Sequence, residues 1–133
     1  MFVLHERLEA DTLFVTDWPL CRVLLLNDSN YPWLVLVPRR HGITEVHELD
    51  ASDRQILVEE IAQASHKLQN LTGARKMNVA ALGNMVPQLH VHVIARFDTD
   101  PAWPKPVWGQ VPAASYTADA QAEMVAKLKK ALG

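Results

Sequence analysis

The stretch QLHVHVIAR, residues 88–96, alternates in character with the two-residue period of a β-strand. One face of that strand carries only apolar side chains, at Leu89, Val91 and Val93. The opposite face carries an amide, two imidazoles and an isoleucine, at Gln88, His90, His92 and Ile94. The pattern predicts a strand over residues 89–95 that packs its apolar face on helices and presents two histidines on the other.

Four further apolar runs predict strands around this one, over residues 13–15, 22–26, 33–37 and 77–82. The runs 22–26 and 33–37 are separated by the polar turn cluster NDSNYP, residues 27–32. Two buried runs across a short polar loop are typical of an antiparallel hairpin. Proline at position 38 is expected to end the second strand of that hairpin.

Two helices are predicted. Residues 50–71 repeat apolar side chains at intervals of three to five. Ser52 with Gln55 resembles a capping box, Asp50 is the alternative N-cap, and Gly73 is the expected stop. A last helix is expected to begin after Thr117. The segment between the last strand and this helix, residues 98–112, has four prolines and two tryptophans and is expected to be an irregular loop.

Only one long crossover separates the predicted strands, which argues against a doubly wound parallel sheet. We therefore expect an α+β fold in a single domain over residues 1–133. It has an antiparallel sheet of about five strands, one long helix and a C-terminal helix.

Composition excludes several classes of function. The chain has 13 Lys and Arg against 15 Asp and Glu, a net charge of −2, which is not the basic surface of a protein that binds long nucleic acids or anionic membranes. No apolar run approaches the roughly 18 residues that span a bilayer. The single cysteine, Cys21, can form no intrachain disulfide and suits a small core residue. These features indicate a cytoplasmic protein.

His90 and His92 carry the strongest chemical signal. Two residues on one strand face lie roughly 6–7 Å apart, so one phosphate group can touch both imidazoles. A neutral imidazole can attack phosphorus, and a second can hydrogen-bond or protonate the departing oxygen. Backbone N–H groups of the turn at Gly83 and Asn84 are placed to hold the phosphate oxygens. The segment therefore favours nucleotidyl transfer.

Two other interpretations of the histidines are weaker. Strand histidines are often structural or surface residues. They can also bind zinc or iron, but such a site needs a third ligand. Arg96 stands where an acidic ligand would follow, and Asp98 and Asp100 fall in the expected loop. His41 or His47 could serve only if the fold brought them close. We therefore predict no metal site.

The segment 88–94 resembles the signature of the histidine triad (HIT) family of nucleotide hydrolases and transferases, His-apolar-His-apolar-His-apolar-apolar. The stretch WLVLVPRRH, residues 33–41, resembles the family strand that ends in proline, two basic residues and histidine. Asn27 matches the position of a ribose-contacting polar residue, and Asn78, Gly83 and Asn84 resemble the strand and turn that line the phosphates. Family-like order and spacing cover residues 10–96.

The resemblance implies that His90 is the nucleophile and forms a nucleotidyl-histidine intermediate. It implies that His92 contacts the phosphate and the leaving group, and that His41 is a supporting histidine. Gln88 departs from the pattern, because it replaces the first histidine with an amide that can hydrogen-bond but cannot carry a proton charge. Met85 also stands where relatives often have Ser or Thr.

The implied protein is a homodimeric enzyme that needs no cofactor. Its partner is a small-molecule nucleotide, either a dinucleoside polyphosphate or a nucleoside phosphoramidate. A second hypothesis, motivated by Gln88 and Met85, is a module that binds and senses nucleotides without cleaving them.

The remaining candidates have structural explanations as well as functional ones. Arg39 and Arg40 fit a solvated strand end, with phosphate steering as the alternative. Arg96 could reach a distal phosphate or form a surface salt bridge. His5, His47 and His66 are expected to be surface or helix-packing residues. Trp103 and Trp108 are expected to be core or interface anchors, with base stacking as the alternative.

Overall fold

A five-stranded antiparallel sheet forms the centre of the computed structural model, which describes all residues, 1–133. Its strands lie in the order β1-β2-β3-β5-β4, and every neighbouring pair is antiparallel. The strands are β1 (Thr12–Asp17), β2 (Cys21–Leu26), β3 (Trp33–Pro38), β4 (Lys76–Ala80) and β5 (Val91–Arg96). The expected α+β class and the hairpin of residues 22–37 are confirmed.

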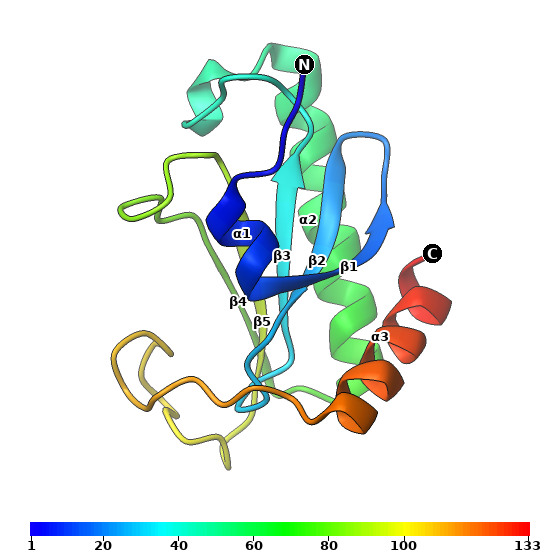
Figure 1. The fold of residues 1–133 in the computed structure, drawn as a ribbon, viewed down its shortest axis with the longest axis vertical. Helices are drawn as coiled ribbons and strands as arrows, with labels where there is room; N and C mark the ends of the chain where they lie inside the picture. The colour runs from blue at the N-terminus through cyan, green and yellow to red at the C-terminus, as the bar shows by residue number, and fades with distance from the viewer.

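The helices divide between the two faces of the sheet (Figure 1). The long helix α2 (Ala51–Thr72) and the C-terminal helix α3 (Ala118–Leu132) cover one face, where α2 packs on β5 and α3 on β1. The short helix α1 (Glu6–Asp11) lies on the other face, and a turn of 3-10 helix, η1 (Val46–Glu48), precedes α2. None of the helices is long and apolar enough to cross a bilayer.

Each face of the sheet has its own core. Alternate strand residues such as Val91 and Val93 join Leu57, Leu68 and Leu128 in the larger cluster beneath α2 and α3. The residues between them face the other way, into a smaller cluster beneath α1 and the segment that follows β5: Leu8, Leu24, Tyr31, Trp33, Val35, Val37, Ile94, Ala102 and Val107. The predicted apolar face of the histidine strand therefore does pack on the helices, and its histidines belong to the opposite side.

The helix ends follow from their capping residues. Asp50 is the N-cap of α2, because its carboxylate accepts a hydrogen bond from the backbone N–H of Asp53 at 2.8 Å. Ser52, the other N-cap considered, instead donates to the Asp50 carboxylate at 2.9 Å. Gly73 ends α2 in the left-handed region, at φ 73°, and Thr117 caps α3.

Two predicted strand ends are wrong. β4 ends at Ala80 rather than at residue 82, and β5 begins at Val91 rather than at residue 89. Ala80 is the last β4 residue that pairs with β5, opposite His92. The chain between the two strands then leaves the sheet, and the N–H of Leu89 bonds to the carbonyl of Ile43 instead of a strand. His90 therefore lies just before β5, where no neighbouring strand covers it.

Candidate functional site

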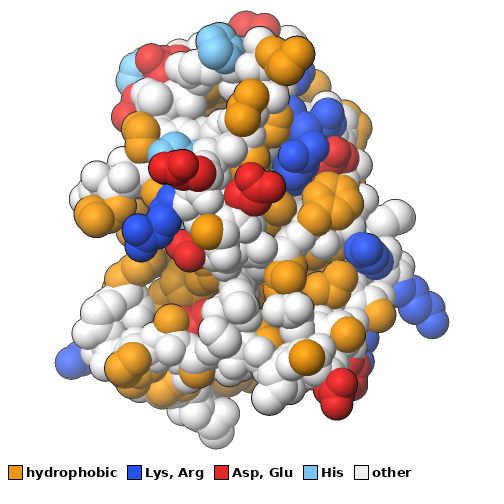
Figure 2. Space-filling view, viewed as in Figure 1, with side chains coloured by type: hydrophobic (Ala, Val, Ile, Leu, Met, Phe, Trp, Pro, Cys, Tyr) orange, Lys and Arg blue, Asp and Glu red, His pale blue; other side chains and the backbone are white.

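A cavity of about 1070 Å³ lies on the sheet face that carries α1. Its floor is formed by side chains of β3, β5 and the residue before β5, including Trp33, His90 and His92. Helix α1, the loop of residues 82–86 and Trp108 form its walls. In the space-filling view, apolar side chains line a hollow on this face and charged side chains stand at its rim (Figure 2). A mostly apolar pocket with a few polar groups is typical of a small-molecule site.

His90 is oriented by the backbone. Its Nδ1 lies 2.7 Å from the carbonyl oxygen of Gln88, and the residue is only 7% exposed. A carbonyl can only accept, so Nδ1 must carry the proton and donate it. In the neutral ring the lone pair then lies on Nε2, the atom that remains free for a molecule in the cavity. This is the protonation state that a nucleophilic imidazole needs.

His92 has the opposite tautomer. The indole Nε1–H of Trp33 donates to Nδ1 of His92 at 3.0 Å, and an indole nitrogen can only donate. Nδ1 of His92 is therefore unprotonated, and the hydrogen of the neutral ring lies on Nε2. The two histidine rings stand edge to face with centroids 4.9 Å apart. One imidazole thus offers a lone pair at Nε2 and its neighbour offers an N–H.

Burial keeps His92 neutral. Removal from water, together with the neighbouring His90, lowers the pKa of His92 from 6.5 to about 4. Aromatic rings complete this environment, because Trp33 and Trp108 meet His92 edge-on with centroid distances of 5.5 and 5.2 Å. At neutral pH His92 is thus a hydrogen-bond donor without a positive charge.

The loop of residues 82–86 brings backbone groups to the cavity. Gly83 adopts φ 74°, in the left-handed region where a side chain would be strained. Gly83, Asn84 and Met85 all line the cavity, and Met85 is 89% exposed. The predicted turn therefore lies beside His90 and His92.

Gln88 and His41 do not line this cavity. The Gln88 amide donates to the carbonyl of Val3 at 2.9 Å and accepts from the N–H of His5 at 2.8 Å. His41 lies with Nδ1 3.1 Å from the carbonyl of Met1. Both side chains thus hold the N-terminal segment, residues 1–5, which leads directly into α1. Gln88 belongs to the site through the backbone carbonyl that orients His90.

Asn27 and Asn78 are also engaged elsewhere. The Asn27 side chain accepts from the backbone N–H of Tyr116 at 3.0 Å, and the Asn78 side chain accepts from Arg96 at 2.7 Å. Neither side chain lines the cavity. Asn27 thus ties the segment before α3 to the end of β2, and Asn78 joins β4 to β5, while the ribose and phosphate contacts expected of them stay predictions.

Arg96 is not a surface residue. It is 1% exposed, forms a two-bond ion pair with Asp100 at 2.8 and 3.1 Å, and also donates to the carbonyl of Lys105. Burial disfavours the Asp100 carboxylate, but hydrogen bonds from Arg96 and from the backbone N–H of Phe97 outweigh it and lower the pKa of Asp100 to about 2. This pair fastens the long loop that brings Trp108 to the cavity.

The two arginines at the end of β3, Arg39 and Arg40, also bond to groups within the protein. Arg40 forms a two-bond ion pair with Asp53 at 2.7 and 3.1 Å. Arg39 donates to the carbonyls of Trp18 and Pro19. Neither arginine lines the cavity, so the structure favours their structural interpretation.

The cavity lining also includes His5 and Trp33, which were not predicted as site residues, and Trp108, for which base stacking was only the alternative interpretation. Trp33 was assigned only to the apolar run of its strand, because no sequence pattern shows which side chain an indole N–H meets. Its register does place it near the histidines, since Val35 pairs directly with His92 in the ladder. His5 caps α1 by accepting from the N–H of Arg7 at 3.0 Å, and this contact depends on how the N-terminal segment folds back.

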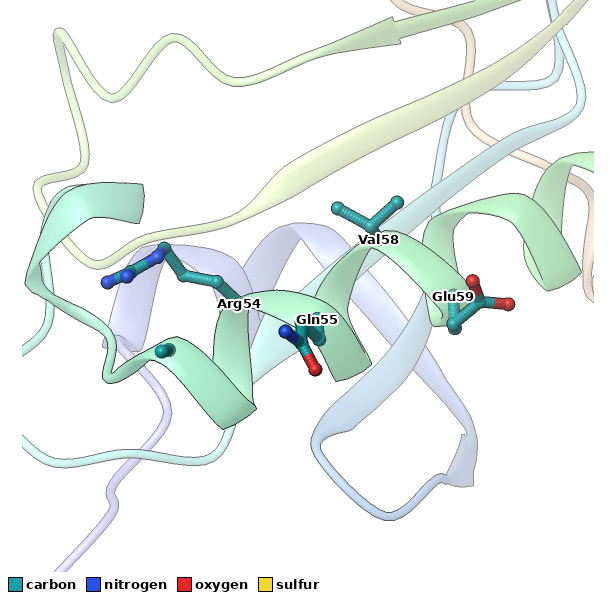
Figure 3. A pocket seen from close by; sticks show the side chains of 5 residues that line it. Arg54, Gln55, Val58 and Glu59 are labelled. Atoms are coloured by element: carbon teal, nitrogen blue, oxygen red, sulfur yellow. The ribbon is translucent and has the colours of Figure 1, made fainter.

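Another hollow lies on the outer side of α2, lined by Ala51, Arg54, Gln55, Val58 and Glu59 (Figure 3). It is open and contains no histidine, cysteine or buried polar group. No three His, Cys, Asp or Glu side chains anywhere in the chain come together as a group that could hold a metal ion.

The model of the HIT domain family matches residues 7–99, which include both histidines and all five strands. The chain belongs to the HIT family. Histidine triad proteins of known structure agree with it over almost the whole chain. One from Marinobacter aquaeolei VT8 is 53% identical, with a TM-score of 0.96, and the match covers 99% of this chain and 96% of that one.

Two further HIT proteins, from Bradyrhizobium japonicum and Sinorhizobium meliloti 1021, are each 44% identical, with TM-scores of 0.96 and 0.95. The first match covers 99% of this chain and 98% of that one, and the second covers 98% and 97%. No match was found among curated protein sequences. The HIT family is a family of nucleotide-binding proteins whose members are typically nucleotide hydrolases or transferases.

Proposed function

We propose that the chain is a nucleotide-phosphate hydrolase or nucleotidyl transferase that works through a covalent nucleotidyl intermediate on His90. The observation that carries the proposal is the 2.7 Å bond between Nδ1 of His90 and the Gln88 carbonyl, which leaves Nε2 with its lone pair at the cavity. The substrate is a small nucleotide of the dinucleoside polyphosphate or nucleoside phosphoramidate type. No cofactor is required for this chemistry.

The reaction has two steps. Nε2 of His90 attacks the phosphorus, the N–P bond forms, and the bond from phosphorus to the leaving group breaks with its electron pair on the leaving group. The positive charge that develops on the His90 ring is stabilised by the Gln88 carbonyl, to which Nδ1–H donates. Water or another acceptor then attacks the phosphorus, and the electron pair of the N–P bond returns to Nε2.

The developing charge on the phosphate oxygens has donors nearby. His92, Gly83 and Asn84 line the same cavity as His90, so Nε2–H of His92 and the backbone N–H groups of this loop are the donors that we assign to the phosphate. Donors fixed before the reaction are worth roughly 10²–10³ in rate each. The apolar walls, with Trp33 and Trp108, offer surfaces for a base.

Intact-mass spectrometry tests the covalent step. Wild-type protein mixed with dinucleoside polyphosphates or adenosine phosphoramidate is expected to gain the mass of one nucleotidyl group and to turn the substrate over. His90→Ala is expected to show neither. The matched control is His66→Ala, because His66 is exposed on α2, hydrogen-bonds to Asn70 and does not line the cavity. Neither adduct nor turnover with wild type across this panel contradicts the proposal.

A nucleotide-binding module without catalysis is the second candidate function. It is favoured by Gln88, whose amide oxygen and nitrogen each bond to the N-terminal segment, and by Met85, which has no hydroxyl to offer a phosphate. Calorimetry separates the two functions. Tight nucleotide binding without turnover supports the module, and hydrolysis that is abolished in His90→Ala contradicts it.

A further inference from the structure

The contact between Trp33 and His92 determines what His92 can do in a reaction. Trp33 begins β3, and the ladder places it diagonally across from His92, whose direct partner is Val35. The two side chains lie on the same face of the sheet and meet through the 3.0 Å bond from Nε1–H to Nδ1. To accept a second proton, His92 would have to break this bond and gain a charge in a site only 8% exposed.

A neutral imidazole locked in this way can donate a hydrogen bond but cannot give up a proton. Loss of the Nε2 hydrogen would leave an imidazolate anion, which is far too basic to form at neutral pH. His92 can therefore stabilise negative charge on a phosphate oxygen through Nε2–H. It cannot protonate a leaving group, which is the other role that sequence alone leaves open for it.

The other titratable groups at the cavity do not supply this proton either. His90 is the attacking base, and its Nδ1–H is held by the Gln88 carbonyl. The Nδ1 of His5 is engaged as the N-cap of α1, where it accepts the N–H of Arg7 at 3.0 Å. Glu6 is an exposed carboxylate, and Asp11 pairs with Arg7 at 3.1 Å.

Position 88, where the family pattern has its first histidine, does not supply a general acid either. An amide stands there at Gln88, and both of its polar atoms are bonded to the N-terminal segment. A leaving group in this cavity can therefore accept hydrogen bonds, but no side chain is positioned to transfer a proton to it.

We propose that Trp33 is a positioning residue that holds His92 as a neutral Nε2–H donor, and that the site transfers nucleotidyl groups from leaving groups that depart as stable anions. This inference rests on the proposed function and narrows its substrate class. A phosphate leaving group has a second pKa near 6, so it departs from an anhydride as an anion and needs no proton. The amine of a phosphoramidate must gain a proton on nitrogen before the P–N bond can break.

In the transfer from an anhydride, one bond to phosphorus forms and one breaks. The Nε2 lone pair of His90 becomes the N–P bond, and the electron pair of the P–O bond leaves with the phosphate oxygen. No proton moves in this step. In the second step, water forms the new P–O bond, the N–P pair returns to Nε2, and the proton of the water passes to solvent.

Three adenylyl donors with different leaving groups test the selectivity. They are a diadenosine polyphosphate, the p-nitrophenyl ester of AMP and adenosine 5′-phosphoramidate. The first two are expected to turn over, and the phosphoramidate is expected to have a kcat/KM at least about 100-fold lower at neutral pH, the lower end of what a placed acid supplies. Equal kcat/KM for the phosphoramidate and the nitrophenyl ester overturns the inference. Absence of any adduct from all three donors instead contradicts the proposed function.

Nitrogen-15 NMR of the histidine rings tests the role of Trp33 without any substrate. In wild type, His92 is expected as the pure Nε2–H tautomer. Trp33→Phe keeps an aromatic ring but removes the donor, so a mixture of tautomers and an easier protonation of His92 are expected. The matched control is Trp108→Phe, since Trp108 also contacts His92 edge-on but forms no hydrogen bond with it. In this control the tautomer is expected to stay unchanged.

Kinetics of Trp33→Phe distinguish a positioning role of Trp33 from a purely structural one. Trp33→Phe is expected to lower kcat on the diadenosine substrate by about tenfold, with a smaller change in KM, because the donor is aligned mainly for the transition state. An Nδ1–H tautomer for His92 in wild type overturns the inference, and so does an unchanged tautomer in a folded Trp33→Phe variant. The wild-type spectrum and the substrate series decide the question even if that variant fails to fold.

Discussion

The lowered pKa of His92 affects the stability of the protein as well as the chemistry of the site. Its pKa in the folded state is about 4, below the 6.5 of an unperturbed histidine. Between these two pH values the unfolded chain binds a proton that the folded chain refuses, so stability falls as pH falls from 6.5 toward 4. Above pH 6.5 neither state binds the proton, and His92 adds no pH dependence.

We expect this effect to reach up to about 3 kcal/mol at pH 4. Urea denaturation of wild type and His92→Gln between pH 4 and 7.5 measures it. The wild type is expected to lose more stability than the variant on acidification. Parallel curves for the two proteins contradict the assignment.

Both partners of the Arg96–Asp100 pair are almost completely removed from water, with side chains 2% and 4% exposed, so removal of either one leaves the other as an uncompensated buried charge. Arg96→Met leaves the Asp100 carboxylate buried without its partner, and we expect a loss of about 3–5 kcal/mol in chemical denaturation. The control is Lys127→Ala on α3, whose pair with Glu123 is more than half exposed and is expected to be worth less than about 0.5 kcal/mol. Similar losses in the two variants contradict this difference.

At the scale of elements, α1 is a six-residue helix that cannot be stable by itself. The Gln88 amide anchors the segment before it, as a peptide group would in a β-bridge. Gln88→Ala is expected to speed hydrogen exchange over residues 3–8 and to cost about 1–2 kcal/mol of stability. His41→Ala removes one exposed contact to the same segment and is the milder control. Unchanged exchange in Gln88→Ala contradicts the anchoring role.

The elements were mostly predictable because they depend on local patterns. Periodicity located both long helices and all five strands. Capping chemistry located Gly73 and Thr117, but it gave Ser52 with Gln55 ahead of Asp50, the cap that the structure shows. The strand ends at Ala80 and Val91 were not predictable, since they depend on where neighbouring strands stop pairing.

Only the residues around the two histidines of the site could be predicted from the sequence. His90, His92, Gly83 and Asn84 lie within one short stretch of chain and meet at the cavity. His5 and Trp108 reach it through long-range contacts that no local pattern encodes. Asn27 and Asn78 were singled out for their positions in the family pattern, but their hydrogen bonds are made with Tyr116 and Arg96. Residue type thus indicated which groups carry the chemistry, and tertiary contacts decided which of them face the cavity.

At the scale of the whole molecule, the sheet has two edges, β1 and β4. Each edge exposes one large apolar side chain, Phe14 at 50% and Val79 at 47%. The Arg22 guanidinium covers the Phe14 ring at 5.6 Å, whereas Val79 has no such cover. Unpaired strand edges invite pairing with another chain, and we propose that the homodimer implied by the family resemblance uses the β4 edge.

Light scattering after size exclusion tests this proposal. Wild type is expected at about twice the chain mass of 14.9 kDa. Val79→Lys is expected to shift the population toward monomer, and Phe14→Lys is expected to leave it dimeric. A monomeric wild type contradicts the dimer, and dissociation by Phe14→Lys alone contradicts the choice of edge.

The ring contacts around His92 also mean that tryptophan fluorescence can report whether the cavity is occupied. Trp33 and Trp108 stand edge-to-face with centroids 5.6 Å apart, and both touch His92. Indole emission responds to nearby charge and to stacked aromatic groups, so a nucleotide base entering the cavity would change the fluorescence of these two rings directly. The other two tryptophans, Trp18 and Trp103, lie outside the cavity and contribute a constant background. Occupancy of the unlabelled protein can therefore be followed in real time, without a reporter group attached to either molecule.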